Sequence, residues 1–507
     1  MGADRLDARC KMAINVGSSS VKTSTFFDRG RVDININFIG LERQVVKVKY
    51  NRLNSYPDRL YQVSIGDNLG MAASVILSEA IRVLRELKWP MPELIGHRVK
   101  FAGFGKRVER FTEKNEVRMI FNDYLSSRHN RLCLEVLREA KQAFPDAEQL
   151  MVRDQINDDL SLHNESKIPF DHPTIRRYGL YAHGYHGLAV KACLAQMRKD
   201  FNTSDFNGVI CHVGSGVSFT AVSSGKVVFN TMQYAACDGA VMHNRSGTQP
   251  IGIALRFLKY GLKSGDLSNV YSRLSGIYGL ANLSADSSIT VEDILSQPQY
   301  TQAKNAYLKA NGVELFRAIT ALESVNGFIF SGGLATKHRW LGPELLLSAK
   351  AITPEIKDSF VADLNTPGAR YATAGDTALY LIDVDEQACI LDACEDFSSA
   401  ADDFEITSGA CEVPGTSVGI VEEGRNGWRR GSICLCLSDT ELPFDCSTLP
   451  EGFIFYGKSR GDFFLRAALA RNSGIPAVFI ERSSQGPCSL LGKNIYMDTP
   501  TQKVVIL

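Results

Sequence analysis

The most informative segment of this chain is Ile14-Asn15-Val16-Gly17-Ser18-Ser19-Ser20-Val21-Lys22. The apolar residues before its turn predict a buried strand, and a second strand pattern follows from Val21. A strand-turn-strand unit with hydroxyls and backbone N–H groups at its tip suits a phosphate group, and Lys22 would add a positive charge. The GxxxxGK[ST] spacing of a P-loop is absent. Taken alone, the segment also fits an ordinary hairpin turn.

Composition narrows the class of protein. The 507 residues predict more than one domain. A formal net charge of zero removes the electrostatic argument for binding nucleic acid or an anionic membrane. None of the 12 cysteines forms a CxxC pair, which favours reduced thiols in a cytoplasmic protein over disulfides or a zinc site. We expect neither a signal peptide nor a membrane-spanning segment.

Hydrophobic periodicity predicts alternating strands and helices. Strands are expected within 9–64 and at 94–99, 208–213, 217–222, 226–230 and 327–330, and helices at 70–87, 131–143, 187–197, 250–260 and 303–322. Residues 383–404 are rich in Asp, Glu, Ala and Ser and predict a solvated linker with room for one short helix. A smaller unit begins near residue 405.

Three turns that contain glycine each follow an apolar strand. They are Gly17-Ser18-Ser19-Ser20, Gly214-Ser215-Gly216 and Ser331-Gly332-Gly333. Glycine lets the backbone approach a ligand, and phosphates need free N–H groups. Together the turns predict a nucleotide held by two phosphate loops and a glycine pair on its adenosine side. The alternative is three ordinary turns at strand ends.

The order of these motifs resembles the acetate kinase family, within the larger group of actin, sugar kinases and heat-shock chaperone ATPases. The resemblance rests on seven motifs: 15–22 (NVGSSSVK), 96–99 (GHRV), 128–130 (RHN), 176–184 (RRYGLYAHG), 212–216 (HVGSG), 244–247 (NRSG) and 330–333 (FSGG). They cover roughly residues 9–384.

The resemblance implies an α/β fold of two ribonuclease-H-like lobes with the nucleotide cleft between them. We expect one lobe at roughly 9–160 with 365–384, the other at 161–364, and a linker at 385–407. The implied reaction is transfer of a phosphoryl group from ATP to a small-molecule carboxylate with Mg²⁺. The family also implies a homodimer with its interface in the kinase part. From the neutral net charge and the absence of a long apolar run we expect no nucleic acid or membrane partner.

The same resemblance implies roles for individual residues. The expected catalytic residues are Arg98, His129, Asp154, His183 and Arg245. The expected nucleotide-binding residues are Ser18, Ser20, Lys22, Gly214, Ser215, Gly216, Ser331, Gly332 and Gly333, and the metal would be held by Asn15 and Asp376. The paired N–H donors of an arginine guanidinium suit a carboxylate and a phosphoryl group during its transfer. Because the carboxylate is already ionised near neutral pH, no strong general base is needed. For His97 and His212 we expect structural roles.

Several positions depart from the family pattern. Ser215 replaces an asparagine, and residues 334–337 (LATK) replace a Gly-Glu-Asn stretch. Asp376 is the surviving carboxylate at the metal-associated position, where a shift of one residue would instead place Gly375. An insertion before His183 leaves His186 as the competing catalytic histidine.

The acceptor pocket departs most. Lys100 and Arg128 stand where the family has an apolar residue and a leucine, and Ala236 replaces a proline. Because unpaired buried cations do not suit the methyl group of acetate, we expect a larger or more anionic carboxylate. The alternative is that both side chains extend to solvent.

Residues 408–507 resemble the swivelling phosphohistidine domain of phosphoenolpyruvate-utilising enzymes, through 467–478 (AALARNSGIPAV). This segment contains no histidine, which excludes phosphohistidine chemistry there. We expect a β/α module that is structural or docks a protein or ligand. A helix is expected at 462–472.

Two readings of function remain from the sequence. The first is an active carboxylate kinase with an altered acceptor. The second is a degenerate nucleotide-binding protein with a regulatory or scaffold role. The retained Asn15, Lys22, Arg98, Asp154 and Arg245 favour the first, and the changes at Ser215, Ala335 and Asp376 favour the second. A sugar kinase or chaperone-like ATPase would leave Arg98 and Arg245 unexplained.

Overall fold

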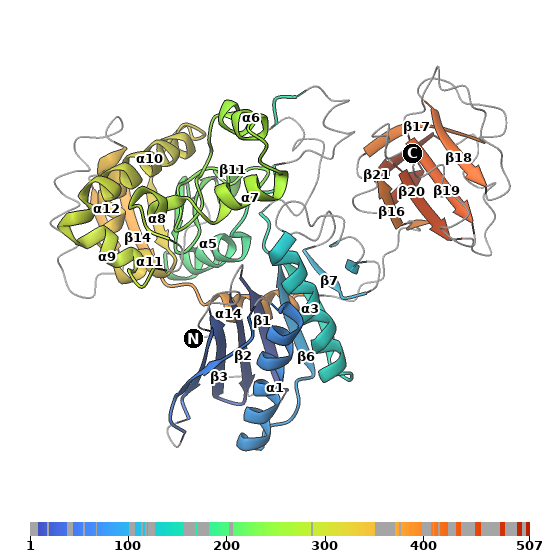
Figure 1. Cartoon of the computed structure of the whole chain (residues 1–507), viewed down its shortest axis with the longest axis horizontal. Coiled ribbons are helices and arrows are strands. Elements are labelled where there is room, and N and C mark those ends of the chain that lie inside the picture. The colour runs from blue at the N-terminus through green and yellow to red at the C-terminus, as the bar shows by residue number, and fades with distance from the viewer. Residues whose placement is uncertain are drawn as a thin grey trace. The chain divides into compact units, whose positions relative to one another are not determined.

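Within its described residues, the computed structural model has three β-sheets (Figure 1). The structure describes residues 9–17, 20–37, 44–53, 56–66, 68–100, 107–112, 115–116, 119, 127–156, 168–170, 182–201, 206–284, 287–349, 371–374 and 377–397, and the strands between 407 and 506. The part of the chain before residue 398 divides between two compact units, the second being 154–157 with 183–389. No helix within the described residues is long and apolar enough to cross a membrane.

The first sheet has eight strands in the order β5-β4-β3-β2-β1-β6-β8-β7. Their bounds are β1 Lys11–Val16, β2 Val21–Phe27, β3 Gly30–Asn37, β4 Gln44–Asn51, β5 Arg59–Val63, β6 Leu94–Val99, β7 Val108–Arg110 and β8 Glu148–Arg153. Helices α1 (Leu69–Leu87) and α3 (Ser127–Ala143) pack against this sheet (Figure 1). The predicted strands and helices of this region are confirmed.

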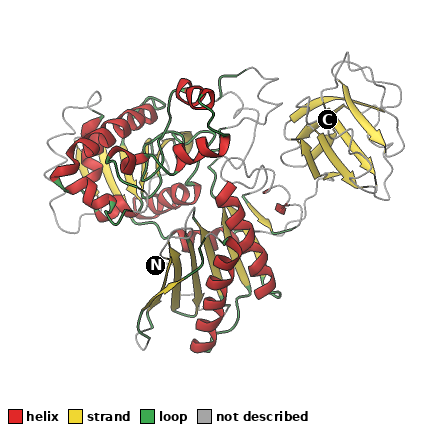
Figure 2. Cartoon of the chain, viewed as in Figure 1, coloured by secondary structure: helices red, strands yellow, loops and turns green. Residues whose placement is uncertain are grey.

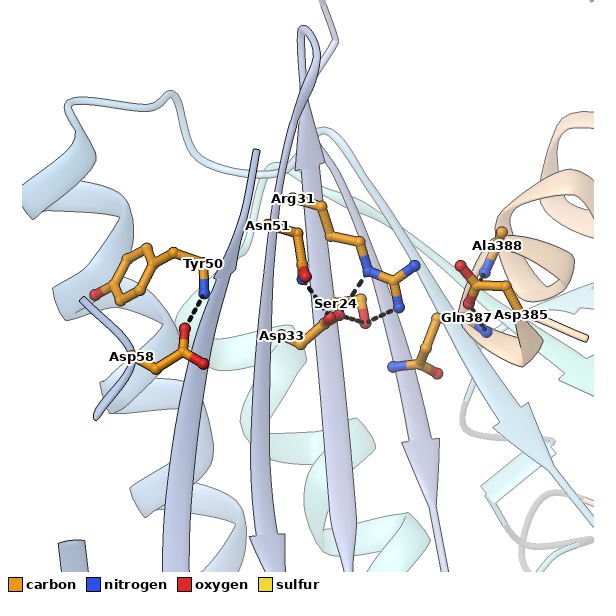
Figure 3. A network of polar contacts seen from close by, with 9 residues as sticks. All are labelled: Ser24, Arg31, Asp33, Tyr50, Asn51, Asp58, Asp385, Gln387 and Ala388. Carbon is orange, nitrogen blue, oxygen red and sulfur yellow. Dashed lines mark hydrogen bonds and ion pairs between the residues drawn. The ribbon is translucent and has the colours of Figure 1, made fainter. Parts of the chain in front are cut away.

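Alternation along the strands creates the two faces of this sheet. In β3, Val32, Ile34 and Ile36 are buried in the core beneath α1, while Asp33 points to the other face. There Asp33 accepts hydrogen bonds from Ser24 on β2, from Arg31 Nε (2.7 Å) and from Asn51 Nδ2 (2.7 Å) on β4 (Figure 3). This network joins three strands on the polar side of the sheet.

The second sheet has six strands in the order β11-β10-β9-β12-β14-β13. Their bounds are β9 Gly208–Val213, β10 Val217–Ser223, β11 Lys226–Asn230, β12 Gly327–Ser331, β13 Tyr371–Ala374 and β14 Thr377–Ile382. The predicted hairpin of β10 and β11 is confirmed. We expected residues 365–384 to join the first lobe. For the described part of this segment the expectation is wrong, because β14 pairs in parallel with β12 and buries Leu379 in this unit.

Helices make up much of the second unit (Figure 2). They are α5 Gly187–Phe201, α6 Ile251–Lys259, α7 Ser264–Ser272, α8 Gly276–Leu280, α9 Val291–Ser296, a 3₁₀ turn at Pro298–Tyr300, α10 Thr301–Ile319, α11 Gly333–Lys337 and α12 Leu341–Ser348. The helices predicted at 187–197, 250–260 and 303–322 are confirmed within a few residues. Helix α10 buries Tyr307, Asn311 and Leu315, which recur at helical spacing.

The segment predicted as a solvated linker contains helix α14, Glu386–Glu395. Its amino end is capped by Asp385 Oδ1, which accepts from the backbone N–H of Gln387 (3.1 Å; Figure 3). Ile390 and Cys394 are buried, and Lys11 on β1 pairs with Glu395. The prediction of a short helix is confirmed, but that of a solvated linker is wrong here, because apolar residues at helical spacing give α14 a face to bury.

The described residues after 406 form the third sheet, in the order β15-β22-β21-β17-β18-β19-β20-β16. Their bounds are β15 Thr407–Ser408, β16 Ala410–Val413, β17 Thr416–Glu423, β18 Ser432–Leu437, β19 Gly452–Gly457, β20 Ala477–Glu481, β21 Asn494–Asp498 and β22 Lys503–Ile506. Parallel pairing joins β17 to β18, β18 to β19 and β19 to β20. The helix predicted at 462–472 lies outside the described residues.

Candidate active site

The first glycine turn joins β1 to β2 as an antiparallel pair. Gly17 N donates to Ser20 O (2.7 Å), which closes the turn. Lys22 is exposed on the polar face of the sheet, and Asn15 on the same face is buried. Ser18 lies outside the described residues. The turn therefore has the strand-turn-strand form that the sequence predicts.

Arg98 and Asn15 meet on adjacent parallel strands. They occupy the same register position of β6 and β1, so their side chains leave the same face of the sheet. Arg98 Nη1 donates to Asn15 Oδ1 (2.9 Å), and each residue is 7% exposed. This pair places a buried guanidinium next to the first glycine turn.

Other predicted residues lie around β6. His97 points away from Arg98, and its Nε2 lies 2.6 Å from Gln149 Oε1 in a fully buried position. This agrees with the structural role expected for it. His129 is buried near the start of α3, and Lys100 is half-buried directly after β6. The side chain of Arg128 lies outside the described residues.

The second and third glycine turns lie side by side. Strands β9 and β12 are parallel neighbours, so their carboxyl ends share one edge of the sheet. A Cβ atom built on Gly214 would lie 3.7 Å from Gly333 N. Ser215 and Gly333 are exposed at this edge. The fold thus joins two backbone turns that are more than a hundred residues apart in sequence.

Each of these turns has a defined internal geometry. Gly214 N donates to Gly216 O (2.9 Å). Gly332 has a φ of +88°, and a Cβ there would lie 2.7 Å from Val213 O, so this position requires glycine. Ser331 is fully buried, and its Oγ lies 3.2 Å from His212 Nδ1. The Ser331 hydroxyl therefore faces His212, which has the structural role expected for it.

His183 and His186 have different surroundings. The ring of His186 lies 4.5 Å from that of His212, and its Nδ1 lies 2.9 Å from Ser218 Oγ. Its Nε2 lies 2.8 Å from where a Cβ on Gly216 would be. The ring of His183 instead lies 5.7 Å from that of Tyr234. His186 thus lies against the second glycine turn, and His183 lies beside the loop that follows β11.

Arg245 comes from that loop, residues 231–250. Its Nη1 donates to Ala236 O (3.1 Å) and lies 3.7 Å from where a Cβ on Gly216 would be. The structure therefore brings together Arg245, His186 and the second glycine turn. It also places Ala236, a predicted pocket residue, in contact with Arg245.

Asp154 follows β8 and is buried. Its Oδ1 accepts from Leu188 N (3.1 Å), and its backbone oxygen accepts from Gly187 N (3.0 Å). Both donors belong to the first turn of α5, where a negative charge is favoured by the helix dipole. The carboxylate is thereby fixed at the amino end of that helix.

Residues 334–337, which replace the Gly-Glu-Asn stretch of the family, lie in helix α11. Leu334 and Ala335 are buried on the inner side of α11. No group of three or more His, Cys, Asp or Glu side chains suited to a metal ion occurs among the described residues, and Asp376 is not among them.

Asp238 was missed by the sequence reasoning. Its Oδ2 accepts from the backbone N–H groups of Tyr234 (2.9 Å) and Ala235 (2.8 Å). Burial raises the pKa of this carboxyl, and those two hydrogen bonds lower it in part. Asp238 thus fixes the backbone at Tyr234 and Ala235. The carbonyl of the next residue, Ala236, accepts from Arg245. A lone Asp before Gly239 carries no distinctive sequence signal.

Comparison with known proteins gives a consistent set of relatives. A family model described as the Acetokinase family matches residues 10–347. A propionate kinase from Yersinia enterocolitica is 28% identical over 349 residues, covering 64% of this chain and 79% of the relative. An acetate kinase from Acaryochloris marina is 24% identical over 342 residues, covering 64% and 83%.

Solved structures agree in fold. A propionate kinase from Francisella tularensis has a TM-score of 0.63 at 19% identity, covering 75% of this chain and 98% of its own. An acetate kinase from Porphyromonas gingivalis has a TM-score of 0.62 at 18% identity, covering 76% and 98%.

Proposed function

Because this chain belongs to the Acetokinase family, we propose that it transfers the γ-phosphoryl group of ATP to a carboxylate and forms an acyl phosphate. A carboxylate oxygen forms the new bond to phosphorus while the bond to the oxygen of the departing ADP breaks. The observation that carries the proposal is the buried Arg98–Asn15 pair beside the first glycine turn. It preserves a permanent cation and an amide at family motif positions.

The proposed chemistry is positioning and charge stabilisation. Arg98 and Arg245 would hold the carboxylate and the phosphoryl group, whose charge spreads over several oxygens during transfer. His183 would donate a hydrogen bond to that group. The turns at Gly214–Gly216 and Gly332–Gly333, of which Ser215 and Gly333 are exposed, would supply backbone groups for the nucleotide.

Mg²⁺ fits the available donors by their chemistry, because Asn15 and Asp376 offer the oxygen ligands that this cation prefers. Asn15 and Asp376 would hold the ion. When bound, it would neutralise phosphate charge.

We further propose an acceptor that is larger or more anionic than acetate. The support is Lys100 and Arg128 at positions where the family is apolar. Lys100 is half-buried and directly follows β6, two residues after Arg98. Cationic side chains beside the acceptor would attract a second anionic group on it.

Acyl-phosphate trapping with hydroxylamine tests the reaction. Wild-type protein with ATP and Mg²⁺ should give hydroxamate with at least one carboxylate of a broad panel. Arg98→Ala and Arg245→Ala should each reduce the rate by about 100-fold or more, since each removes charge stabilisation. Arg85→Ala, an exposed arginine on α1, is the matched control and should leave the rate unchanged.

A wild-type protein that binds nucleotide and phosphorylates no carboxylate would support the degenerate regulatory alternative instead. Among active acceptors, dicarboxylates or phosphorylated acids should exceed acetate in kcat/KM. Acetate as the best substrate would refute the acceptor proposal.

Three broader assignments belong to this proposal. The protein would act as a homodimer in the cytoplasm, and the module at 408–507 would dock a protein or ligand. The described cysteines are free thiols, which supports a reducing compartment. Exposed apolar residues of α6, Ile251, Leu255 and Leu258, support the dimer.

A further inference from the structure

The loop at 231–250 carries Arg245 and Ala236 but contains no helix or strand. An irregular segment has no backbone ladder of its own, so contacts with neighbouring elements must fix its shape. One of these contacts comes from a helix far along the chain.

Asn311 on α10 makes that contact. It is completely buried. Its Oδ1 accepts from Val241 N (2.8 Å), and its Nδ2 donates to Val241 O (3.0 Å). A single side-chain amide thus satisfies both backbone groups of one loop residue. This requires an acceptor and a donor side by side, which a carboxylate or an apolar group does not offer.

The Arg245 turn begins at the next residue. Met242 N donates to Arg245 O (3.1 Å), so residues 242–245 form one closed turn directly after the clasped Val241. Met242 O in turn accepts from Ile277 N (2.9 Å). The turn is therefore held from one side by Asn311 and from another by α8.

The far end of this turn faces the second glycine turn. Arg245 Nη1 and His186 Nε2 lie 3.7 and 2.8 Å from the position of a Cβ on Gly216. Displacement of Val241 would move the guanidinium relative to Gly216. Misplacement of a catalytic group by about 1 Å can lower a rate by about 100-fold.

We propose that Asn311 is a positioning residue, which fixes Val241 and thereby sets the Arg245 guanidinium against the Gly214–Gly216 turn without touching the substrate. This inference rests on the proposed phosphoryl transfer, because it assigns Arg245 a role in that reaction. It adds to the site a residue from an element that carries none of the family motifs.

Tyr307 supports the clasp from one helical turn earlier. It is almost fully buried and lies on the same side of α10 as Asn311. Burial raises the pKa of its hydroxyl above the ordinary value, so the group stays protonated. Tyr307→Phe removes only the buried hydroxyl one turn before Asn311, so it is the milder second variant.

Hydrogen exchange in the full chain tests the clasp without reference to activity. Asn311→Asp keeps the shape of the side chain but sets an oxygen against Val241 O. Peptides spanning 236–248 should exchange at least about 10-fold faster than in wild type, because a lost hydrogen bond opens the loop. Asn305→Asp, at an exposed position of the same helix, should change nothing.

Kinetics test the positioning role. Asn311→Asp should lower kcat by about 10- to 100-fold while the KM for ATP changes little. In an Arg245→Ala background the same change should cost less than about 3-fold, because there is no guanidinium left to position. Tyr307→Phe should give a smaller kcat loss of the same pattern.

The outcomes separate the two proposals. Unchanged exchange in Asn311→Asp overturns the clasp, and faster exchange with unchanged kcat overturns the positioning role. Equal losses with and without Arg245 also overturn it, since they indicate a general structural defect. If wild type transfers no phosphoryl group, the proposed function fails, and the clasp is decided by exchange alone.

Discussion

At the scale of single residues, His183 and His186 are three positions apart but differ in what holds them. His186 is tied to Ser218 and lies against His212 and Gly216. Its backbone is left-handed, with a φ of +62°. The ring of His183 lies 6.3 Å from that of Tyr185 and 5.7 Å from that of Tyr234. The sequence leaves open which of the two histidines is catalytic. Because their surroundings differ, substitutions of His183 and His186 should have different effects on activity and stability.

We predict that His183→Asn lowers kcat about 100-fold with little change in melting temperature, because it would remove the proposed hydrogen-bond donor to the phosphoryl group. His186→Asn should instead lower the free energy of unfolding by about 1–3 kcal/mol, because a buried hydroxyl loses its partner. Asparagine tolerates the left-handed backbone, so the backbone is spared. Steady-state kinetics and thermal melts check both variants, and the reverse pattern would assign the phosphoryl contact to His186.

His97 gives a pH-dependent contribution to stability. Burial lowers its pKa from 6.5 to about 4. The unfolded chain therefore binds the proton first as the pH falls. The stability from neutral His97 is present above pH 6.5 and is lost as the pH falls toward 4. Full burial makes this a contribution on the order of 3 kcal/mol.

Urea unfolding of wild type and His97→Gln at pH 7 and pH 4.5 tests this. The drop in unfolding free energy between the two pH values should be smaller in the variant, because glutamine does not titrate. Other titrating groups contribute to both proteins and cancel in the comparison. An equal drop in the two proteins would contradict the assignment.

At the scale of elements, the packing of α14 on β6 depends on a glycine. A Cβ on Gly96 would lie 2.7 Å from both Cys394 Sγ and Ile390 Cγ2. Such a contact forces backbone or side chains to move. Gly96 therefore allows α14, which follows the predicted kinase portion, to pack closely against the first sheet.

Gly96→Ala should destabilise the protein by about 1–3 kcal/mol, because overpacking costs this much in a filled core. Gly265→Ala on α7, where nothing lies within 4 Å of the new Cβ, is the control and should be neutral or slightly stabilising. Differential scanning calorimetry of both variants measures the effect. A melting temperature for Gly96→Ala equal to that of wild type would show that α14 does not pack as described.

At the scale of the whole molecule, helix α6 has no buried residue. Ile251, Leu255 and Leu258 on it are 73, 59 and 46% exposed. A contiguous apolar helix surface of this kind is typical of a contact with another protein. We propose that a second copy of this chain covers this surface of α6 in the homodimer.

Leu255→Asp should convert a dimer to a monomer, because it places a charge within an apolar interface. Leu60→Asp on β5, where the leucine is 70% exposed, is the matched control and should keep the dimer. Size-exclusion chromatography with light scattering gives the masses. A monomeric wild type, or a dimeric Leu255→Asp, would remove the proposed interface.

Much of the site could be predicted from the sequence because it is encoded locally. The turn after Asn15, the GHRV strand with Arg98 and the glycine turns after β9 and β12 each combine a strand pattern with turn residues. Periodicity then fixes which residues share a face, so Asn15 and Arg98 were predictable partners once β1 and β6 were known to be neighbours.

The rest depended on contacts between distant segments. The sequence alone determined the α/β class, the strand-turn-strand motifs and the family, because these follow from spacing within short segments. Only the tertiary structure decided that β14 belongs to the second sheet, that α14 buries one face and that Asn311 holds Val241. The physical reason is that a backbone N–H, a carbonyl or an apolar helix face can pair with many different groups. The sequence does not specify which distant segment comes into contact with it. The strand-turn-strand segment at 14–22 can therefore be predicted from the sequence, and the placement of Arg245 cannot.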